Sequence, residues 1–233
     1  MLKQLVPRPV KRKIKETLNR RALDATLNEI AHLPAGELPS AVLLERLQQA
    51  WDNEGMAAQT AYLREVARHA SQASGPILEC GSGLTTLIIG LFAGRRGIKS
   101  WTLEHFPDWH QRVSQTLARQ RISTVNNYLS PLKDYGDFSW YDPPREGLPD
   151  SFSLIVCDGP PGSTKGGRYG VVPILKEKLA PGTIILLDDA DREAEADALR
   201  RWSEILELSI SLQAETRGKY AVVTILGLRD KNQ

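Results

Sequence analysis

The sequence predicts an α/β fold in which a mostly parallel sheet follows several N-terminal helices. From Pro76 onward, short apolar or β-branched runs alternate with helix-like segments, and this alternation is the signature of βαβ units. The last two runs are joined only by the turn at 215–219, so we expect them to form an antiparallel hairpin at the edge of the sheet. The 233-residue chain is 41% hydrophobic and 25% charged, which is typical of a soluble globular protein.

The first 70 residues predict helices rather than strands. Residues 10–31 place apolar side chains at helical spacing, namely Ile14, Leu18, Leu23, Leu27 and Ile30. A second helix is expected at 40–51, capped by Ser40, and a third at 56–70. We therefore divide the chain into an N-terminal helical extension with a basic arm, residues 1–70, and a sheet-containing domain, residues 71–233.

Seven runs are predicted to form the strands of the sheet. They are residues 77–80, 98–103, 122–128, 154–157, 183–187, 208–214 and 220–228. The first five are expected to be parallel and the last two to form the hairpin. Parallel strands joined by helices bring their carboxyl ends to one edge of the sheet, where α/β proteins bind their ligands.

Charge is distributed unevenly along the chain. Residues 1–21 carry a net charge of +7, because Glu16 is their only acidic residue, and the remainder carries −5. The basic arm predicts either contact with an anionic surface or a solvated helix face. The acidic excess outside the arm argues against a nucleic-acid partner.

The cysteines and the hydropathy indicate a cytoplasmic protein. Cys80 and Cys157 lack the spacing of a zinc site, so we expect two buried thiols that lie close together if their strands are neighbours. No apolar run reaches the ~18 residues of a membrane-spanning helix, and the basic N-terminus is not followed by the apolar stretch of a secretory signal. A homo-oligomer is compatible with this sequence.

A glycine-containing turn follows the first predicted strand. Gly81 and Gly83 let the backbone turn tightly and let a ligand approach closely. Glu104, at the end of the next strand, comes 21 residues after Gly83, the separation at which a carboxylate accepts hydrogen bonds from a ribose diol. The arrangement predicts that the chain binds an adenosine-containing cofactor.

Two residues favour a methyl donor over a dinucleotide. Thr86 stands where a dinucleotide-binding turn has its third glycine or alanine. Glu79 places a carboxylate at the turn, where it would repel a pyrophosphate but attract an ammonium group. A nicotinamide-dependent oxidoreductase remains the alternative on fold grounds, although the terminal hairpin fits it poorly.

With these motifs, residues 75–228 resemble the class I S-adenosylmethionine-dependent methyltransferases. The resemblance implies a Rossmann-like sheet of seven strands with the final strand antiparallel. It implies that Glu79, Gly81 and Gly83 surround the amino-acid part of S-adenosylmethionine, that Glu104 holds the ribose, and that segment 129–132 contacts adenine. The predicted cofactor site consists of Glu79, Gly81, Ser82, Gly83, Thr85, Glu104 and Asp158.

Acidic residues follow two later strands. Asp158 ends one strand, and Asp188 and Asp189 end the next, so the three carboxylates should converge. Oxygen ligands without His or Cys suggest Mg²⁺. The pattern resembles that of metal-dependent small-molecule O-methyltransferases, which implies a metal-bound acceptor hydroxyl with a lowered pKa. Alternatively, Asp188 and Asp189 cap the helix at 193–206, and Asp158 binds the cofactor or orders its loop.

Other candidates surround this acidic cluster. The loop 159–169 is glycine-rich and polar, which predicts a mobile lid. Within it, Arg168 is predicted to act in catalysis with Asp158 and Asp188, and Arg168 and Arg192 either hold an anionic substrate or balance the aspartates. Without a metal, one of the aspartates, His105 or His110 would serve as general base. The aromatic pair at 140–141 offers a wall for the acceptor.

These features together predict methyl transfer from S-adenosylmethionine to a hydroxyl of a small molecule, such as a sugar or a natural-product intermediate, with Mg²⁺ as a candidate second cofactor. A methyltransferase that uses the basic arm to hold RNA or another polyanion is a second hypothesis. A non-enzymatic module that interacts through its N-terminal helices is a third. Intact Glu79, Gly81, Gly83 and Glu104 argue against the third hypothesis.

Overall fold

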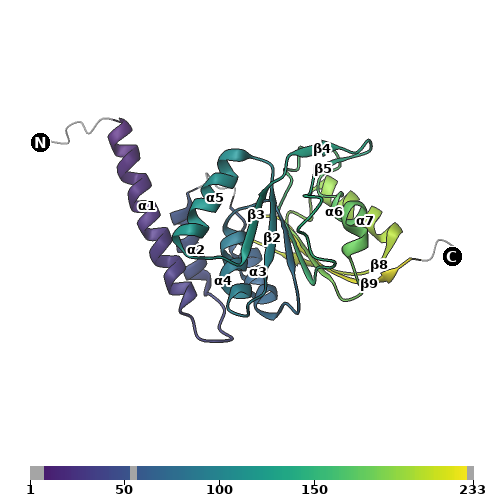
Figure 1. Cartoon of the computed structure of the whole chain (residues 1–233), viewed down its shortest axis with the longest axis horizontal. Coiled ribbons are helices and arrows are strands. Elements are labelled where there is room, and N and C mark those ends of the chain that lie inside the picture. The colour runs from purple at the N-terminus through teal and green to yellow at the C-terminus, as the bar shows by residue number, and fades with distance from the viewer. Residues whose placement is uncertain (1–7, 53–56, 230–233) are drawn as a thin grey trace, which may run out of the picture.

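A twisted seven-stranded sheet forms the centre of the molecule, with helices on both faces (Figure 1). The computed structural model describes residues 8–52 and 57–229. The strands of the sheet are β1 (Ile77–Cys80), β2 (Ser100–Glu104), β3 (Val125–Leu129), β6 (Leu154–Cys157), β7 (Ile184–Leu187), β8 (Leu206–Ala214) and β9 (Lys219–Leu228). Their order across the sheet is β3-β2-β1-β6-β7-β9-β8.

The strand directions confirm the predicted topology. Every neighbouring pair from β3 to β7 is parallel, whereas β9 runs antiparallel to both β7 and β8. The hairpin of β8 and β9 thus lies at one edge, as the short connection between these strands predicts. Cys80 of β1 and Cys157 of β6 lie opposite each other on neighbouring strands, and both are buried thiols that form no disulfide bond.

A small antiparallel pair, which we did not expect, lies in the connection between β3 and β6. It consists of β4 (Leu132–Asp134) and β5 (Ser139–Tyr141). Each strand is only three residues long, too short to produce a recognisable alternation of apolar and polar residues. This pair places Tyr141 at the carboxyl end of the main sheet.

The helices follow the predicted order. They are α1 (Arg8–Ala31), α2 (Ala41–Trp51), α3 (Thr60–Gln72), α4 (Leu84–Gly94), α5 (Pro107–Arg119), α6 (Val171–Leu175), which continues into a 3₁₀ turn at Lys176–Lys178, and α7 (Glu193–Ile205). Ser40 caps α2 as predicted, because its hydroxyl accepts a hydrogen bond from the Leu43 amide at 3.2 Å. The third helix begins at Thr60, later than the expected Met56, which lies outside the described residues.

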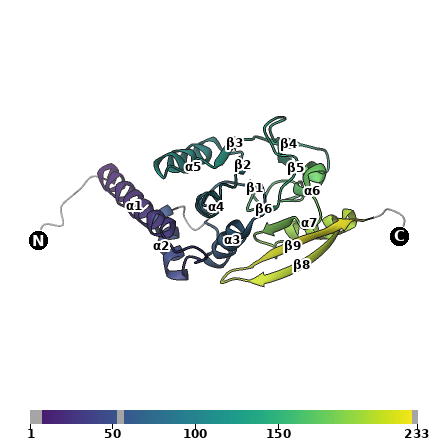
Figure 2. The same cartoon turned by 60° about the horizontal axis from the view of Figure 1, so that its bottom comes forward.

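The N-terminal helices share a hydrophobic core with the sheet domain. Leu44, Leu63 and Leu186 belong to one buried cluster, and they come from α2, α3 and β7. The buried Tyr62 hydroxyl donates a hydrogen bond to the Leu186 carbonyl at 3.1 Å. α3 therefore covers one face of the sheet, and α6 and α7 lie on the other (Figure 2). The predicted boundary after residue 70 remains a prediction, although α3 contributes directly to the core.

Among the residues that the structure describes, we find no helix with both the length and the apolar character needed to cross a bilayer.

Candidate functional site

The turn after β1 packs against the turn after β6. Gly81 has a φ of +86°, a conformation that favours glycine. A Cβ atom there would lie 3.0 Å from the backbone nitrogen of Gly159. Glycine at 81 is thus required both by the backbone conformation and by the close approach of the second turn. The two turns together shape the carboxyl edge of the sheet.

Glu104 ends β2 beside the glycine turn. Its Oε2 accepts hydrogen bonds from the backbone amide and the hydroxyl of Ser82, both at 2.8 Å, and its Oε1 accepts one from the Phe106 amide at 2.8 Å. His105 Nδ1 lies 3.2 Å from Glu104 Oε1. Burial raises the pKa of Glu104, but these hydrogen bonds outweigh it and hold the pKa below its ordinary value. Glu104 is therefore a buried, ionised acceptor at the place where a ribose diol is expected.

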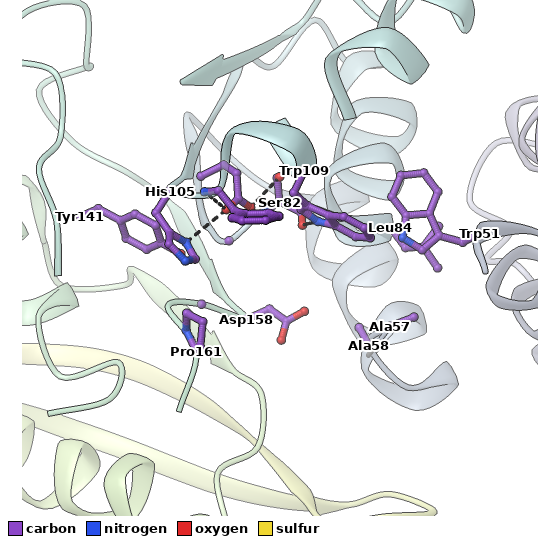
Figure 3. A pocket seen from close by; sticks show the side chains of 15 residues that line it. Trp51, Ala57, Ala58, Ser82, Leu84, His105, Trp109, Tyr141, Asp158 and Pro161 are labelled. Atoms are coloured by element: carbon purple, nitrogen blue, oxygen red, sulfur yellow. Dashed lines mark hydrogen bonds and ion pairs between the residues drawn. The ribbon is translucent and has the colours of Figure 1, made fainter. Parts of the chain in front are cut away.

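A cavity of about 340 Å³ opens beside these residues (Figure 3). Five residues of the predicted cofactor site line it, namely Gly81, Ser82, Gly83, Glu104 and Asp158. Its other lining residues are Trp51, Ala57, Ala58, Leu84, His105, Phe106, Trp109, Tyr141, Gly159 and Pro161. The cavity has the size and the largely apolar lining of a small-molecule site, with a few polar groups at one end.

The two remaining predicted cofactor residues lie beneath the cavity. Glu79 and Thr85 are buried and do not line it. The Thr102 hydroxyl donates a hydrogen bond to Glu79 Oε2 at 2.8 Å, whereas Glu79 Oε1 is buried without a partner among the described residues. Burial raises the pKa of Glu79 to about 7. Direct contact of either residue with a cofactor remains a prediction.

The N-terminal helices supply a wall of the cavity that the sequence did not reveal. Trp51, at the end of α2, lies edge-to-face with Trp109 of α5, with ring centroids 5.5 Å apart. The guanidinium of Arg112 stacks over both rings and donates to the Trp51 carbonyl. Figure 3 shows Trp51, Ala57 and Ala58 at the opposite end of the cavity from Tyr141. In the sequence, Trp51 is marked only as the single aromatic residue of α2.

The predicted acidic cluster forms, but it encloses an arginine. Asp158, Asp188 and Asp189 each offer a carboxylate oxygen within 4.8 Å of the others. Arg168, which is 2% exposed, donates to Asp189 Oδ2 at 2.9 Å and lies 3.5 Å from Asp158 Oδ1. Its guanidinium also donates to the backbone carbonyls of Asp158 and Asp188. The sequence predicts three roles for Arg168: catalysis, binding of an anionic substrate and balancing of the aspartates. The structure supports the last, because the side chain lines neither of the two cavities at this edge. A part in catalysis remains a prediction.

Burial and mutual repulsion control the ionisation of this cluster. The pKa of Asp158 is raised well above its ordinary value, chiefly by burial and then by the negative charge of Asp188. Burial and Asp189 likewise raise the pKa of Asp188. Burial alone would lower the pKa of Arg168, but the surrounding aspartates raise it above its ordinary value. Arg168 is therefore a permanent cation between carboxylates that retain protons more readily than usual.

The donor set matches Mg²⁺ in kind but not in charge balance. Three carboxylate oxygens are ligands that a hard cation prefers. However, converging carboxylates require a cation only where their charges are not neutralised, and the Arg168 guanidinium already supplies a positive charge among these three. Arg192 adds a second, with its Nη2 2.8 Å from Asp189 Oδ1. A metal would have to share these oxygens with two guanidinium groups.

A second cavity of about 340 Å³ adjoins the first. It is polar and is lined by Ala57, Ala58, Gln59, Asp158, Asp188, Asp189, Asp191, Arg192, Arg217 and Gly218. Three of these residues, Asp158, Ala57 and Ala58, also line the first cavity. Asp158 thus stands at the junction of a largely apolar cavity and an acidic one.

The structure separates the remaining candidates. His105 lines the first cavity, whereas His110 Nε2 lies 3.1 Å from the Asn127 carbonyl and does not line it. The capping alternative for the aspartates is wrong: α7 begins after Arg192, and no side chain caps it. Asp188 Oδ1 instead accepts a hydrogen bond from the Asp189 amide at 2.9 Å.

The structure also shows where segment 129–132, the loop 159–169 and the aromatic pair at 140–141 lie relative to the cavity. Segment 129–132 does not line the cavity, so its contact with adenine remains a prediction. Tyr141 lines the cavity, but Trp140 is fully buried in the core. The loop 159–169 is anchored at its end by the buried Arg168 and Tyr169, and it reaches the cavity through Gly159 and Pro161. Its predicted motion remains a prediction.

The strand order, the glycine turn after β1 and the acid after β2 define the class I S-adenosylmethionine-dependent methyltransferase fold, and solved structures agree. Podospora anserina methyltransferase PaMTH1, solved with S-adenosylhomocysteine bound, aligns over 98% of this chain and 100% of its own, with a TM-score of 0.59 and 16% identity. The O-methyltransferase TomG from Streptomyces achromogenes, involved in tomaymycin synthesis and solved with S-adenosylmethionine, aligns over 90% and 99%, with a TM-score of 0.52 and 13% identity.

A further likeness spans a smaller share of both chains. A SAM-dependent O-methyltransferase from Thermotoga maritima aligns over 83% of this chain and 74% of its own, with a TM-score of 0.55 and 11% identity. No family model matches the sequence, and no curated protein matches it. At these identities the comparisons establish the fold, and the activity must be argued from the site.

Proposed function

We propose that the protein transfers a methyl group from S-adenosylmethionine to a hydroxyl of a small, polar acceptor. The observation that carries this proposal is the meeting of two cavities at Asp158. The first has the glycine turn and Glu104 at one end, and the second is lined by four aspartates. A cofactor and an acceptor bound in these cavities would meet at the carboxyl ends of the strands, where this fold binds its ligands.

The first cavity supplies groups suited to each part of S-adenosylmethionine. Glu104 is the acceptor for the ribose diol. Its Oε2 accepts hydrogen bonds from both the amide and the hydroxyl of Ser82, and rotation of that hydroxyl would free one acceptor position for the ribose. The glycines at 81 and 83 leave the backbone open to close approach. Trp51 and Trp109 form an apolar wall. When bound, the cofactor supplies a methyl group on a positively charged sulfur.

Asp158 is the candidate general base. Burial and the charge of Asp188 raise its pKa, so its carboxylate, once ionised, is a stronger base than an ordinary aspartate. Asp158 would accept the hydroxyl proton as the acceptor oxygen takes the methyl group that the bound cofactor would supply, with S-adenosylhomocysteine as the leaving group. Arg168 holds the Asp158 carbonyl at 2.8 Å and so fixes the position of this residue. His105, which lines the same cavity, is the alternative base.

The second cavity supports a hydroxylated acceptor. Asp188, Asp189 and Asp191 offer acceptors for hydroxyl hydrogens, and Arg192 and Arg217 offer donors at the rim. A sugar or a hydroxylated natural-product intermediate has this chemistry. Two of the structural neighbours are O-methyltransferases by name, which supports oxygen as the methylated atom. The acidic lining disfavours RNA or another polyanion in this cavity.

Mg²⁺ assistance is a second candidate, favoured by the three carboxylate oxygens that lie within 4.8 Å of one another. Asp158, Asp188 and Asp189 would hold the ion, which would lower the pKa of a bound hydroxyl. Mg²⁺ titration after chelation distinguishes the two versions. Turnover that survives chelation supports Asp158 as the base, and turnover that requires added Mg²⁺ supports the metal.

Calorimetry tests the proposal first. We expect micromolar binding of S-adenosylmethionine to the purified chain and no comparable binding of NAD. Asp158→Asn should preserve cofactor binding but reduce transfer of a labelled methyl group to hydroxylated acceptors by about a hundredfold or more. Asp197→Asn, at a half-buried site on α7 that lines neither of these two cavities, is the matched control. Tight NAD binding without binding of the methyl donor would refute the proposal.

A further inference from the structure

The N-terminal half of α1 presents apolar side chains to solvent. Val10, Ile14 and Leu18 are 43%, 50% and 58% exposed. At about 100° per residue, they fall within an arc of roughly 80° on the helix surface. The residues that bury α1 against the body, such as Leu23 and Leu27, lie on the roughly opposite side of the helix. The stripe formed by Val10, Ile14 and Leu18 therefore faces away from the protein.

Basic residues flank this stripe on both sides. Lys11 and Lys15 lie along one flank, where Lys15 Nζ also pairs with Asp52 Oδ2 at 2.7 Å, and Lys13 and Arg20 lie along the other. All four, together with Arg12 and Arg21, are exposed. Glu16 is the only acidic residue between positions 8 and 21. Figures 1 and 2 show α1 at one end of the molecule, where no other labelled helix covers its outer side.

We propose that the outer face of α1 docks on an anionic lipid bilayer, with Val10, Ile14 and Leu18 in the headgroup boundary and the flanking lysines and arginines on lipid phosphates. An apolar stripe between two basic flanks is the pattern of helices that lie in a membrane interface. The long basic side chains can extend their charges to the headgroups while their carbon stems stay beside the stripe. The inference is independent of the reaction at Asp158.

The basic flanks of the stripe favour an anionic bilayer over a second copy of this chain or a nucleic acid. A symmetric contact between two copies would bring the same basic flanks together, and like charges would repel at close range. Nucleic acid would satisfy the basic residues, but it gives no reason for three exposed aliphatic side chains at one helical spacing. A bilayer with anionic headgroups accounts for both features at once.

Vesicle co-sedimentation of the full chain tests the proposal. We expect binding to vesicles of equal parts phosphatidylcholine and phosphatidylglycerol at low salt, loss of binding near 0.5 M salt, roughly where screening shortens the range of the charges, and no binding to phosphatidylcholine alone. Ile14→Ser with Leu18→Ser should weaken binding at least about tenfold. Val42→Ser, which alters a side chain 66% exposed on α2, is the matched control and should leave binding unchanged.

A charge-reversed pair completes the test. Lys11→Glu with Lys13→Glu should weaken vesicle binding by roughly thirtyfold or more, whereas Lys99→Glu, at an exposed site outside α1, should have little effect. The proposal is overturned if the chain ignores anionic vesicles, if the Ile14 and Leu18 variant binds them normally, or if that variant instead dissociates a dimer seen by light scattering. Tight binding to RNA that survives loss of the stripe, without vesicle binding, would also overturn it.

Discussion

The contact between the two turns at the edge of the sheet gives a sharp prediction for Gly81→Ala. Gly81 combines a φ of +86° with a Cβ position 3.0 Å from the Gly159 nitrogen and 3.1 Å from the Gly159 Cα. Gly36 has almost the same φ, +85°, but nothing within 4 Å of its Cβ position. The two glycines therefore share the backbone conformation and differ in the close approach, so Gly36→Ala is a matched control.

The expected losses of stability follow from that difference. An alanine forced into the left-handed region costs about 1–2 kcal/mol, and this applies to both variants. Gly81→Ala also brings its Cβ into close contact with the backbone of Gly159, which cannot rotate away as a side chain can, and this overpacking costs about a further 1–3 kcal/mol. We therefore expect the free energy of unfolding to fall by roughly 1–2 kcal/mol for Gly36→Ala and by roughly 2–5 kcal/mol for Gly81→Ala.

Urea unfolding measures both values, and calorimetry measures S-adenosylmethionine binding to each folded variant. Gly81→Ala should weaken binding at least about tenfold, because the two turns that line the cavity must move apart. Gly36→Ala, in the loop before α2, should bind as the unchanged protein does. Equal losses of stability in the two variants, or normal binding by Gly81→Ala, would refute the reasoning.

Three further predictions concern the buried charges. The pKa of Glu79 rises to about 7 in the folded chain, so the native state holds this proton to higher pH than the unfolded state does. The free energy of unfolding should therefore fall by up to about 3 kcal/mol as the pH rises from about 4.5 to 7. Glu79→Gln should remove this part of the pH dependence, and an unchanged pH dependence in urea unfolding would contradict the assignment. Arg168→Met should lower the free energy of unfolding by about 3–5 kcal/mol at neutral pH, because it leaves the aspartates unneutralised. This loss, measured by urea unfolding, should become smaller in acid, and a loss that is constant with pH would argue against a charge-balancing role. Glu104→Ala should weaken S-adenosylmethionine binding in calorimetry by at least about tenfold with little change in fold by circular dichroism; binding at the unchanged affinity would remove Glu104 from the ribose site.

Local patterns in the sequence determined the sheet and one end of the cavity. The alternation of short apolar runs with helix-like segments predicted the parallel sheet, and the short connection at 215–219 predicted its antiparallel hairpin. The glycine turn and Glu104 were readable because strand, turn and helix are contiguous and the acid ends the next strand along the chain. Gly81, Ser82, Gly83, Glu104 and Asp158 accordingly line the cavity.

Only the tertiary structure decided how the charges are balanced and what closes the cavity. Trp51 precedes the glycine turn by about thirty residues and reaches the cavity because α2 packs beside α5. Arg168 looked like a loop residue, yet the fold buries it among Asp158 and Asp189. A side chain's partners across the chain depend on how elements dock, and sequence periodicity records only which face of each element is apolar.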